Sequence, residues 1–288
     1  MKIAFSLPVF IRDDYKASDL KLLYNCISTL GLSDEALLVI YNQGYFSNNE
    51  LKSLMKTLKI NCDILGDGTN VGIPIARQKT FEYIWSTYPT IEYIGELHLD
   101  MIFYNKWYEP LMDFLNTHPN EPMISPGLID ANGFYVIDRN IQYTLPKTLP
   151  EICDLLQSVK NDIVHEWLVH PAIHKSQCLK DIGGIDLRFF KGKQGYEDYS
   201  ILIGYHNYIG SKNNWKPKLY GMSTVYHAYC QQRWTVKDVQ KDIWINEEGL
   251  FNQYGAYGFK YLSEMLNDKE IMGPFYEKRV NNFINWNV

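Results

Sequence analysis

Strand and helix signals alternate through the first 116 residues of this 288-residue chain. The predicted strands, each a short apolar run, lie at residues 3–9, 37–41, 60–65 and 91–99. The predicted helices between them lie at residues 20–30, 47–59, 74–86 and 107–116. This alternation is typical of an α/β fold with a mostly parallel sheet and helices on both faces. Ligands bind such sheets at the carboxyl ends of the strands, so we expect the functional site in the loops that follow them.

The second half of the chain is less regular, with hairpin signals at 123–136, a helix at 149–160, a helix at 196–204 and a strand at 219–226. From residue 235 onward the pattern is mainly helical. We therefore predict one domain over residues 1–230, divided into halves at 1–104 and 105–230. Residues 231–288 are expected to form a mainly helical C-terminal extension.

Composition excludes some classes of protein. The net charge of −5 gives no overall basic field for nucleic acid, although a local basic groove stays possible. Five cysteines without a Cys-x-x-Cys motif indicate neither a zinc knuckle nor a disulfide framework, which favours a reducing compartment. The apolar N-terminus is too short for a membrane span and shows no cleavage site, so we expect a cytoplasmic chain without a transmembrane segment.

The segment Glu96-Leu97-His98-Leu99-Asp100 places three ionisable side chains on alternate positions. In a strand these side chains would share one face, and each is costly to bury without a partner. Carboxylate and imidazole ligands together suit a divalent cation, Mn²⁺ or else Mg²⁺. The structural alternative is a buried histidine that bonds to one carboxylate.

Two further segments suit anion binding and proton transfer. The loop 68–72 enters a helix that carries Arg77, an arrangement that binds anions, although it is equally consistent with an ordinary loop and a solvated arginine. Glu197 and Asp198 follow a glycine-rich loop, where one of them could act as a general base or both could stabilise a helix N-terminus. His227 follows a strand and could be a core residue, a metal ligand or a phosphate contact.

The order of these motifs resembles family 2-type glycosyltransferases of the GT-A fold. The resemblance covers roughly Lys2 to His227. It rests on Ser6-Leu7-Pro8-Val9-Phe10, Asn70-x-Gly72-x-x-x-Ala76-Arg77, the strand before Asp100, Gly183-Gly184-Ile185-Asp186-x-x-Phe189-Phe190, Gly195-Tyr196-Glu197-Asp198, and His227.

The resemblance implies a role for each matching position. The nucleotide-sugar site is expected to include Pro8, Phe10, Asn42, Asp67, Asn70, Gly72, Arg77 and His98. The metal ligands are expected to be Asp100, His227 and His98. Asp198, preferred over Glu197, is expected to supply the catalytic base. The acceptor is expected to contact Gly195, Tyr196, Arg233 and Trp234. The chain departs from the family pattern at Asn42, where an acidic residue is common, and at His98, which replaces the first aspartate of Asp-x-Asp.

The resemblance thus implies a metal-dependent glycosyltransferase that uses a nucleotide-sugar donor of the UDP type. Direct attack by the acceptor would invert the anomeric carbon, and retention stays open. The acceptor is expected to be a surface glycan, with a hydroxymethylated base of phage DNA as the alternative. His98 and Asn42 also leave open a catalytically weak nucleotide-sugar-binding module. A nucleotidyltransferase is disfavoured because the first strand lacks a Gly-x-Gly-x-x-x-Arg start.

Overall fold

The computed structural model describes residues 1–269 except 137, 211–212, 229–231 and 233–234. The helices in this part of the chain are α1 (Lys16–Thr29), α2 (Asn48–Thr57), α3 (Ile73–Thr87), α4 (Glu109–Thr117), α5 (Leu149–Ser158), α6 (Ser176–Asp181), α7 (Glu197–Ile209) and α8 (Val239–Leu266). The strands are β1 (Ile3–Val9), β2 (Ala36–Asn42), β3 (Cys62–Gly66), β4 (Tyr93–Glu96), β5 (Met101–Ile102), β6 (Met123–Asp130), β7 (Phe134–Tyr135), β8 (Asp138–Gln142), β9 (Val164–Glu166), β10 (Ile173–Lys175) and β11 (Lys218–His227).

These strands form one mixed sheet with the order β3-β2-β1-β4-β10-β6-β11-β5. The first four strands are parallel, and β6 is parallel to β11. The short strand β10 runs antiparallel between β4 and β6 and so joins the two halves of the sheet. Because β1, β2, β3 and β4 are neighbours and run parallel, their carboxyl ends meet at one edge of the sheet.

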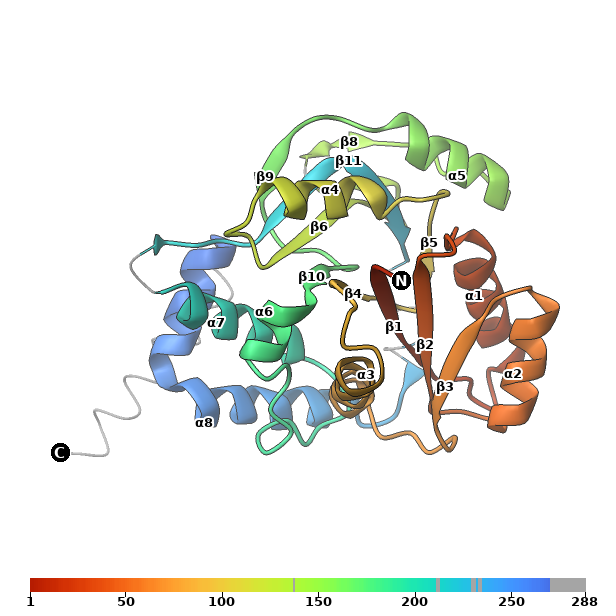
Figure 1. The fold of residues 1–288 in the computed structure, drawn as a ribbon, viewed down its shortest axis with the longest axis horizontal. Helices are drawn as coiled ribbons and strands as arrows, with labels where there is room; N and C mark the ends of the chain where they lie inside the picture. Colours follow the sequence, from red (N-terminus) through yellow and green to blue (C-terminus); the bar gives the residue numbers. More distant parts are fainter. Residues whose placement is uncertain (137, 211–212, 229–231, 233–234, 270–288) are drawn as a thin grey trace.

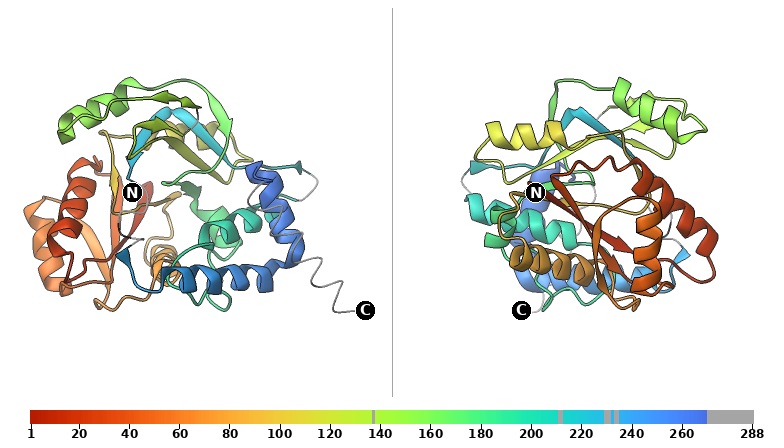
Figure 2. Two further views of the ribbon diagram at one scale, coloured as in Figure 1. Left: turned by 180° about the vertical axis from the view of Figure 1, so that it is seen from behind. Right: turned by 45° about the vertical axis from the view of Figure 1, so that its right-hand side comes forward.

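The sheet separates two layers of helices (Figure 1). Alternate residues of a strand point to opposite faces. Phe5 of β1 accordingly packs into the apolar layer of α1, α2, α4 and α5, whereas its neighbour Ala4 packs into the layer of α3, α6, α7 and α8. The right-hand view of Figure 2 shows β1–β3 between α1 and α2 on one side and α3 on the other.

The predicted fold class is confirmed: the chain has an α/β fold with helices on both faces of the sheet and a long C-terminal helix. One boundary difference changes the site: β4 ends at Glu96, three residues before the expected end at Leu99. Residues 97–100 form a loop and a turn, so His98 and Asp100 do not continue the face of Glu96. Leu97 and Leu99 stay buried beyond the end of the strand, whereas His98 and Asp100 are half-buried.

Helix α8 is the described part of the expected C-terminal extension. It bends at Gly255 (φ 66°, ψ −169°), and its apolar residues Leu250, Phe259 and Leu262 pack into the same layer as α7. Within the residues that the structure describes, no helix combines the length and the apolar character needed to cross a bilayer. Helix α8 therefore belongs to the packed body of the molecule.

Candidate functional site

A cavity of about 500 Å³ lies at the carboxyl edge of the sheet, between the loops after β1, β3 and β4 and the start of α7. Ten of the predicted site residues line it: Pro8, Phe10, Asn70, Gly72, His98, Asp100, Gly195, Tyr196, Asp198 and His227. The cavity therefore brings together predicted residues from both halves of the chain.

Four other predicted residues, which the structure describes, do not line this cavity. The Asn42 side chain is buried, and its amide donates to the Phe46 carbonyl at 2.8 Å and to Asn48 Oδ1 at 2.8 Å. Asp67 is exposed in its loop, where the Thr69 N–H donates to the Asp67 carboxylate at 2.9 Å. Arg77 and Glu197 are buried behind the cavity wall. Arg233 and Trp234 lie outside the described residues.

Gln43, next to Asn42, lines the cavity and was not predicted. Its side-chain oxygen accepts hydrogen bonds from the N–H groups of Val71 and Gly72, at 3.1 and 2.8 Å. Gly72 has a φ of 88°, and a Cβ there would lie 2.4 Å from the Cα of Lys193. Gln43 and Gly72 thus hold the predicted anion-binding loop against the loop that precedes α7.

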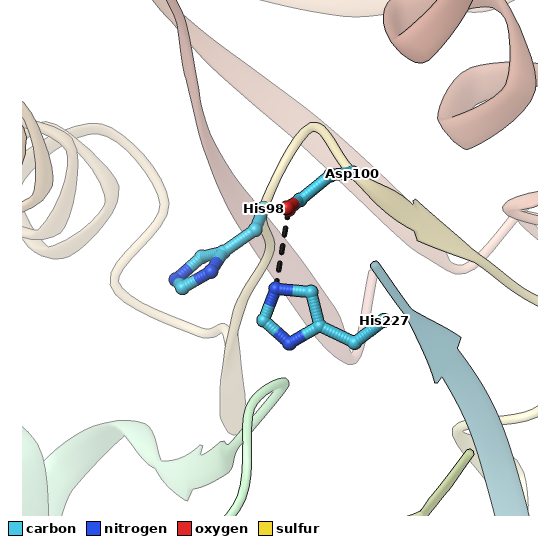
Figure 3. A group of neighbouring side chains, drawn as sticks. All are labelled: His98, Asp100 and His227. Atoms are coloured by element: carbon cyan, nitrogen blue, oxygen red, sulfur yellow. Dashed lines mark hydrogen bonds and ion pairs between the residues drawn. The ribbon is translucent and has the colours of Figure 1, made fainter. Parts of the chain in front are cut away.

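His98, Asp100 and His227 form the first group that could hold a metal ion, with one potential ligand atom from each within 4.8 Å of the others. His227 Nε2 lies 3.1 Å from Asp100 Oδ1, a contact drawn as a dashed line in Figure 3 and fixed by strand pairing. His227 ends β11 and pairs with Met101 of β5, which places it beside Asp100. The Ala228 N–H also donates to the Asp100 carbonyl at 3.0 Å.

His98 differs from the other two residues of this group. Its Nε2 contacts the guanidinium of Arg77, and its ring points away from the Asp100–His227 contact in Figure 3. A guanidinium only donates hydrogen bonds, so Nε2 is the acceptor and the neutral ring carries its proton on Nδ1. The Arg77 contact thus occupies Nε2 of His98, whereas Nε2 of His227 faces a carboxylate. Asp100 and His227 are therefore better suited to hold a divalent cation than His98.

Arg77 connects the elements around the cavity from behind. Its side chain has 0% exposure, and its Nη1 lies 3.0 Å from Glu96 Oε2 and 2.9 Å from Asp198 Oδ1. Glu96 ends β4, whereas Asp198 lies in the first turn of α7, 121 residues after Arg77 in the sequence. One buried guanidinium therefore ties α3, β4 and α7 together.

His170 is a functional candidate that sequence reasoning missed. Its Nε2 lies 2.8 Å from Asp198 Oδ2, and its ring stacks on His98 with the centroids 5.0 Å apart. The segment before it shows no periodicity, and β10, which brings it to the site, has only three residues. A histidine in an irregular segment carries little signal in a single sequence.

Burial and charge set the protonation of this network. Burial raises the pKa of Glu96, and Arg77 opposes that rise. Burial alone would lower the pKa of His170, but the neighbouring Asp198 carboxylate outweighs it, so the pKa of His170 is raised. Burial lowers the pKa of His174 to about 3, which keeps that imidazole neutral beside Glu96.

Glu96, His170 and Asp198 form a second group with ligand atoms within 4.8 Å of one another. This group fits a cation poorly because the Arg77 guanidinium already lies at hydrogen-bonding distance from both carboxylates. A divalent cation would be repelled by the guanidinium and would have to displace it. Of the two groups, the Asp100–His227 pair is the better candidate metal centre.

Comparisons with known proteins support the fold. No family model matches the sequence, and no curated protein matches it. The crystal structure of S. aureus TarS 1–349 matches 93% of this chain and 72% of that chain, at 13% identity and a TM-score of 0.52. The same TarS segment solved with UDP and with UDP-GlcNAc matches over the same shares, at 13% and 12% identity and TM-scores of 0.53 and 0.55. At such identities the likeness establishes the fold, which is the expected GT-A type.

The buried ion pairs of Arg77 predict a large loss of stability when the guanidinium is removed. We expect Arg77→Met to lower the free energy of unfolding by about 3–5 kcal/mol, because Glu96 would keep a buried position without its cation. Arg77→Lys, which keeps the charge but not the planar fork, should lose less. Urea unfolding at pH 7 measures both variants, and equal losses for methionine and lysine would contradict this account.

The raised pKa of His170 predicts a pH-dependent contribution to stability. The stabilisation is fully present below the ordinary histidine pKa of about 6.5 and is lost as the pH rises through the higher folded-state value. We expect the difference in unfolding free energy between wild type and His170→Gln to be largest near pH 6 and to shrink toward pH 9. If this difference in unfolding free energy grew with pH, the ion pair between Asp198 and the His170 imidazolium would not be what stabilises the fold.

Proposed function

We propose that this chain is a glycosyltransferase that moves a sugar from a nucleotide diphosphate sugar, of the UDP type, to an acceptor hydroxyl. One observation carries the proposal: a single cavity is lined by the candidate metal pair Asp100 and His227 and by the candidate base Asp198. The fold supports it, since structures with this fold have been solved with UDP and with UDP-GlcNAc.

The donor would lie along the loops after β1, β3 and β4. Pro8 and Phe10 offer apolar surface for a nucleotide, and Asn70 and Gly72 line the cavity at the start of α3. Asp100 and His227 would hold Mn²⁺ or Mg²⁺. Such a cation neutralises the charge of a departing diphosphate. Because Arg77 is fully buried, we assign it to holding His98 and Asp198 in place rather than to direct contact with phosphate.

The transfer step needs a base for the acceptor hydroxyl. Asp198 takes that proton as the hydroxyl oxygen bonds to the anomeric carbon and the bond from that carbon to the diphosphate breaks. Glu197 is unsuited to this role because its side chain is buried and does not line the cavity. Neighbouring helical residues point in different directions, which explains why only one of the two carboxylates lines it.

For the acceptor we propose a glycan hydroxyl held near Gly195 and Tyr196 at the entrance to α7. Tyrosine rings suit the apolar faces of sugars. The net charge of −5 disfavours the alternative, a modified base of DNA. Product analysis with both kinds of acceptor separates these two possibilities.

A second candidate function, a nucleotide-sugar-binding module with little activity, is favoured by one observation. Both carboxylate oxygens of Asp198 already have cationic partners, Arg77 at 2.9 Å and His170 at 2.8 Å. A carboxylate held in this way is a weaker base. An active enzyme would therefore have to exchange one of these contacts for the acceptor hydroxyl.

Turnover of nucleotide sugars by wild type and matched variants tests the proposal. With Mn²⁺ present, we expect wild type to release UDP from a UDP-sugar, slowly to water and faster to an acceptor. Asp198→Asn should lower kcat by about 100- to 10,000-fold with little change in the Kd for UDP, because the amide fits the same space but accepts no proton. Asp100→Asn should weaken the Mn²⁺-dependent part of UDP binding.

Asp113→Asn removes an exposed carboxylate of α4, far from the cavity lining, and serves as the matched control with wild-type kinetics. Tight UDP binding without any turnover would establish the binding module instead. Unchanged transfer by both Asp100→Asn and Asp198→Asn would contradict the assigned roles.

A further inference from the structure

The loop that leads into α7 is held from behind by the C-terminal helix. Residues 192–196 precede Asp198, and residues 193–196 line the cavity. Asn246 of α8 has 0% exposure and faces this loop. Its Oδ1 accepts from the Gly192 N–H at 2.7 Å, and its Nδ2 donates to the carbonyls of Gly192 and Gln194, each at 3.1 Å.

These three bonds use both amide hydrogens and the oxygen of Asn246 on the backbone of one loop. In the loop between α6 and α7, a buried side chain thus provides hydrogen-bond partners for the backbone of Gly192 and Gln194. A buried backbone group without a partner costs free energy comparable to a lost hydrogen bond. Replacing Asn246 by an apolar residue would therefore remove three hydrogen bonds to the loop.

The same part of α8 makes two further contacts that fix the loop. Tyr196 takes a left-handed backbone conformation (φ 67°, ψ −8°), and its hydroxyl donates to Glu247 Oε2 at 2.7 Å. A non-glycine residue holds such a conformation only where its surroundings impose it. Gly249 lets α8 approach closely, since a Cβ there would lie 2.1 Å from the Phe189 carbonyl oxygen.

The loop also reaches the donor side of the cavity. The Ile73 N–H at the start of α3 donates to the Lys193 carbonyl at 2.7 Å. Asn246 is thus linked through this loop to Asp198, four residues after Gln194, and to the start of α3, which bonds to Lys193. Its effect on the site would act through the loop, since Asn246 itself does not line the cavity.

We propose that Asn246 is a positioning residue that sets the place of Asp198 by fixing the backbone of residues 192–196. The C-terminal helix is then part of the active-site architecture. Removing its contact to the loop lowers kcat more than it weakens the binding of the nucleotide-sugar donor. This inference rests on the proposed function for its kinetic readout, so its test also includes a readout that needs no activity.

The test compares Asn246→Leu with Leu262→Ala, a fully buried residue of α8 beyond Gly255 and away from the loop. For Asn246→Leu we expect amide hydrogen exchange in residues 190–199 to speed up at least about tenfold, kcat to fall at least about tenfold, and the Kd for UDP with Mn²⁺ to change less than about threefold. Leu262→Ala should lower Tm by a similar amount and leave both exchange in 190–199 and kcat near wild type.

Asn246→Asp covers the case in which Asn246→Leu does not fold. It keeps the acceptor for the Gly192 N–H and loses the two donated bonds, so we expect the same changes at smaller size. Unaltered exchange in residues 190–199 in folded variants would overturn the inference, as would an equal loss of kcat in Leu262→Ala. Faster exchange in a protein whose wild type lacks turnover would refute the proposed function alone.

Discussion

Arg77 carries its charge into the interior, where it meets Glu96 at 3.0 Å and Asp198 at 2.9 Å and contacts the ring of His98. A buried charge is tolerated only when it is paired and hydrogen-bonded, and here each partner comes from a different element. The guanidinium therefore does more than balance charge. It links the end of β4 to the first turn of α7, and residues at both places, Leu97 and Asp198, line the cavity.

The two sides of the cavity are held by different kinds of contact. On the metal side, the pairing of β11 with β5 sets His227 beside Asp100, so backbone register determines that geometry. On the base side, Asp198 depends on side-chain partners, Arg77 and His170, and on a loop fastened by Asn246. Strand register is rigid, whereas a loop held by side chains is easier to shift. We therefore expect any conformational change during the proposed transfer to occur around Asp198 rather than around Asp100 and His227.

Much of this architecture follows from sequence patterns, since the alternating apolar runs predict the parallel sheet and the motif order predicts ten of the residues that line the cavity. Three parts could not be obtained that way. The end of β4 at Glu96 follows no local pattern, since the apolar alternation continues through Leu97 and Leu99. His170 arrives through the three-residue strand β10, too short for a periodic signal. Asn42 looked like a ligand contact, but its amide satisfies local backbone groups, and Gln43 lines the cavity instead.

The assignment of Asp100 and His227 as metal ligands is best tested by a crystal structure with UDP and Mn²⁺, in which anomalous scattering locates the metal. We expect one Mn²⁺ bound by Asp100, His227 and the diphosphate, with Arg77 still buried between Glu96 and Asp198. Manganese bound at Glu96, His170 and Asp198 instead, or UDP bound away from Asp100, would show that Asp100 and His227 are not the metal ligands of a nucleotide-sugar site.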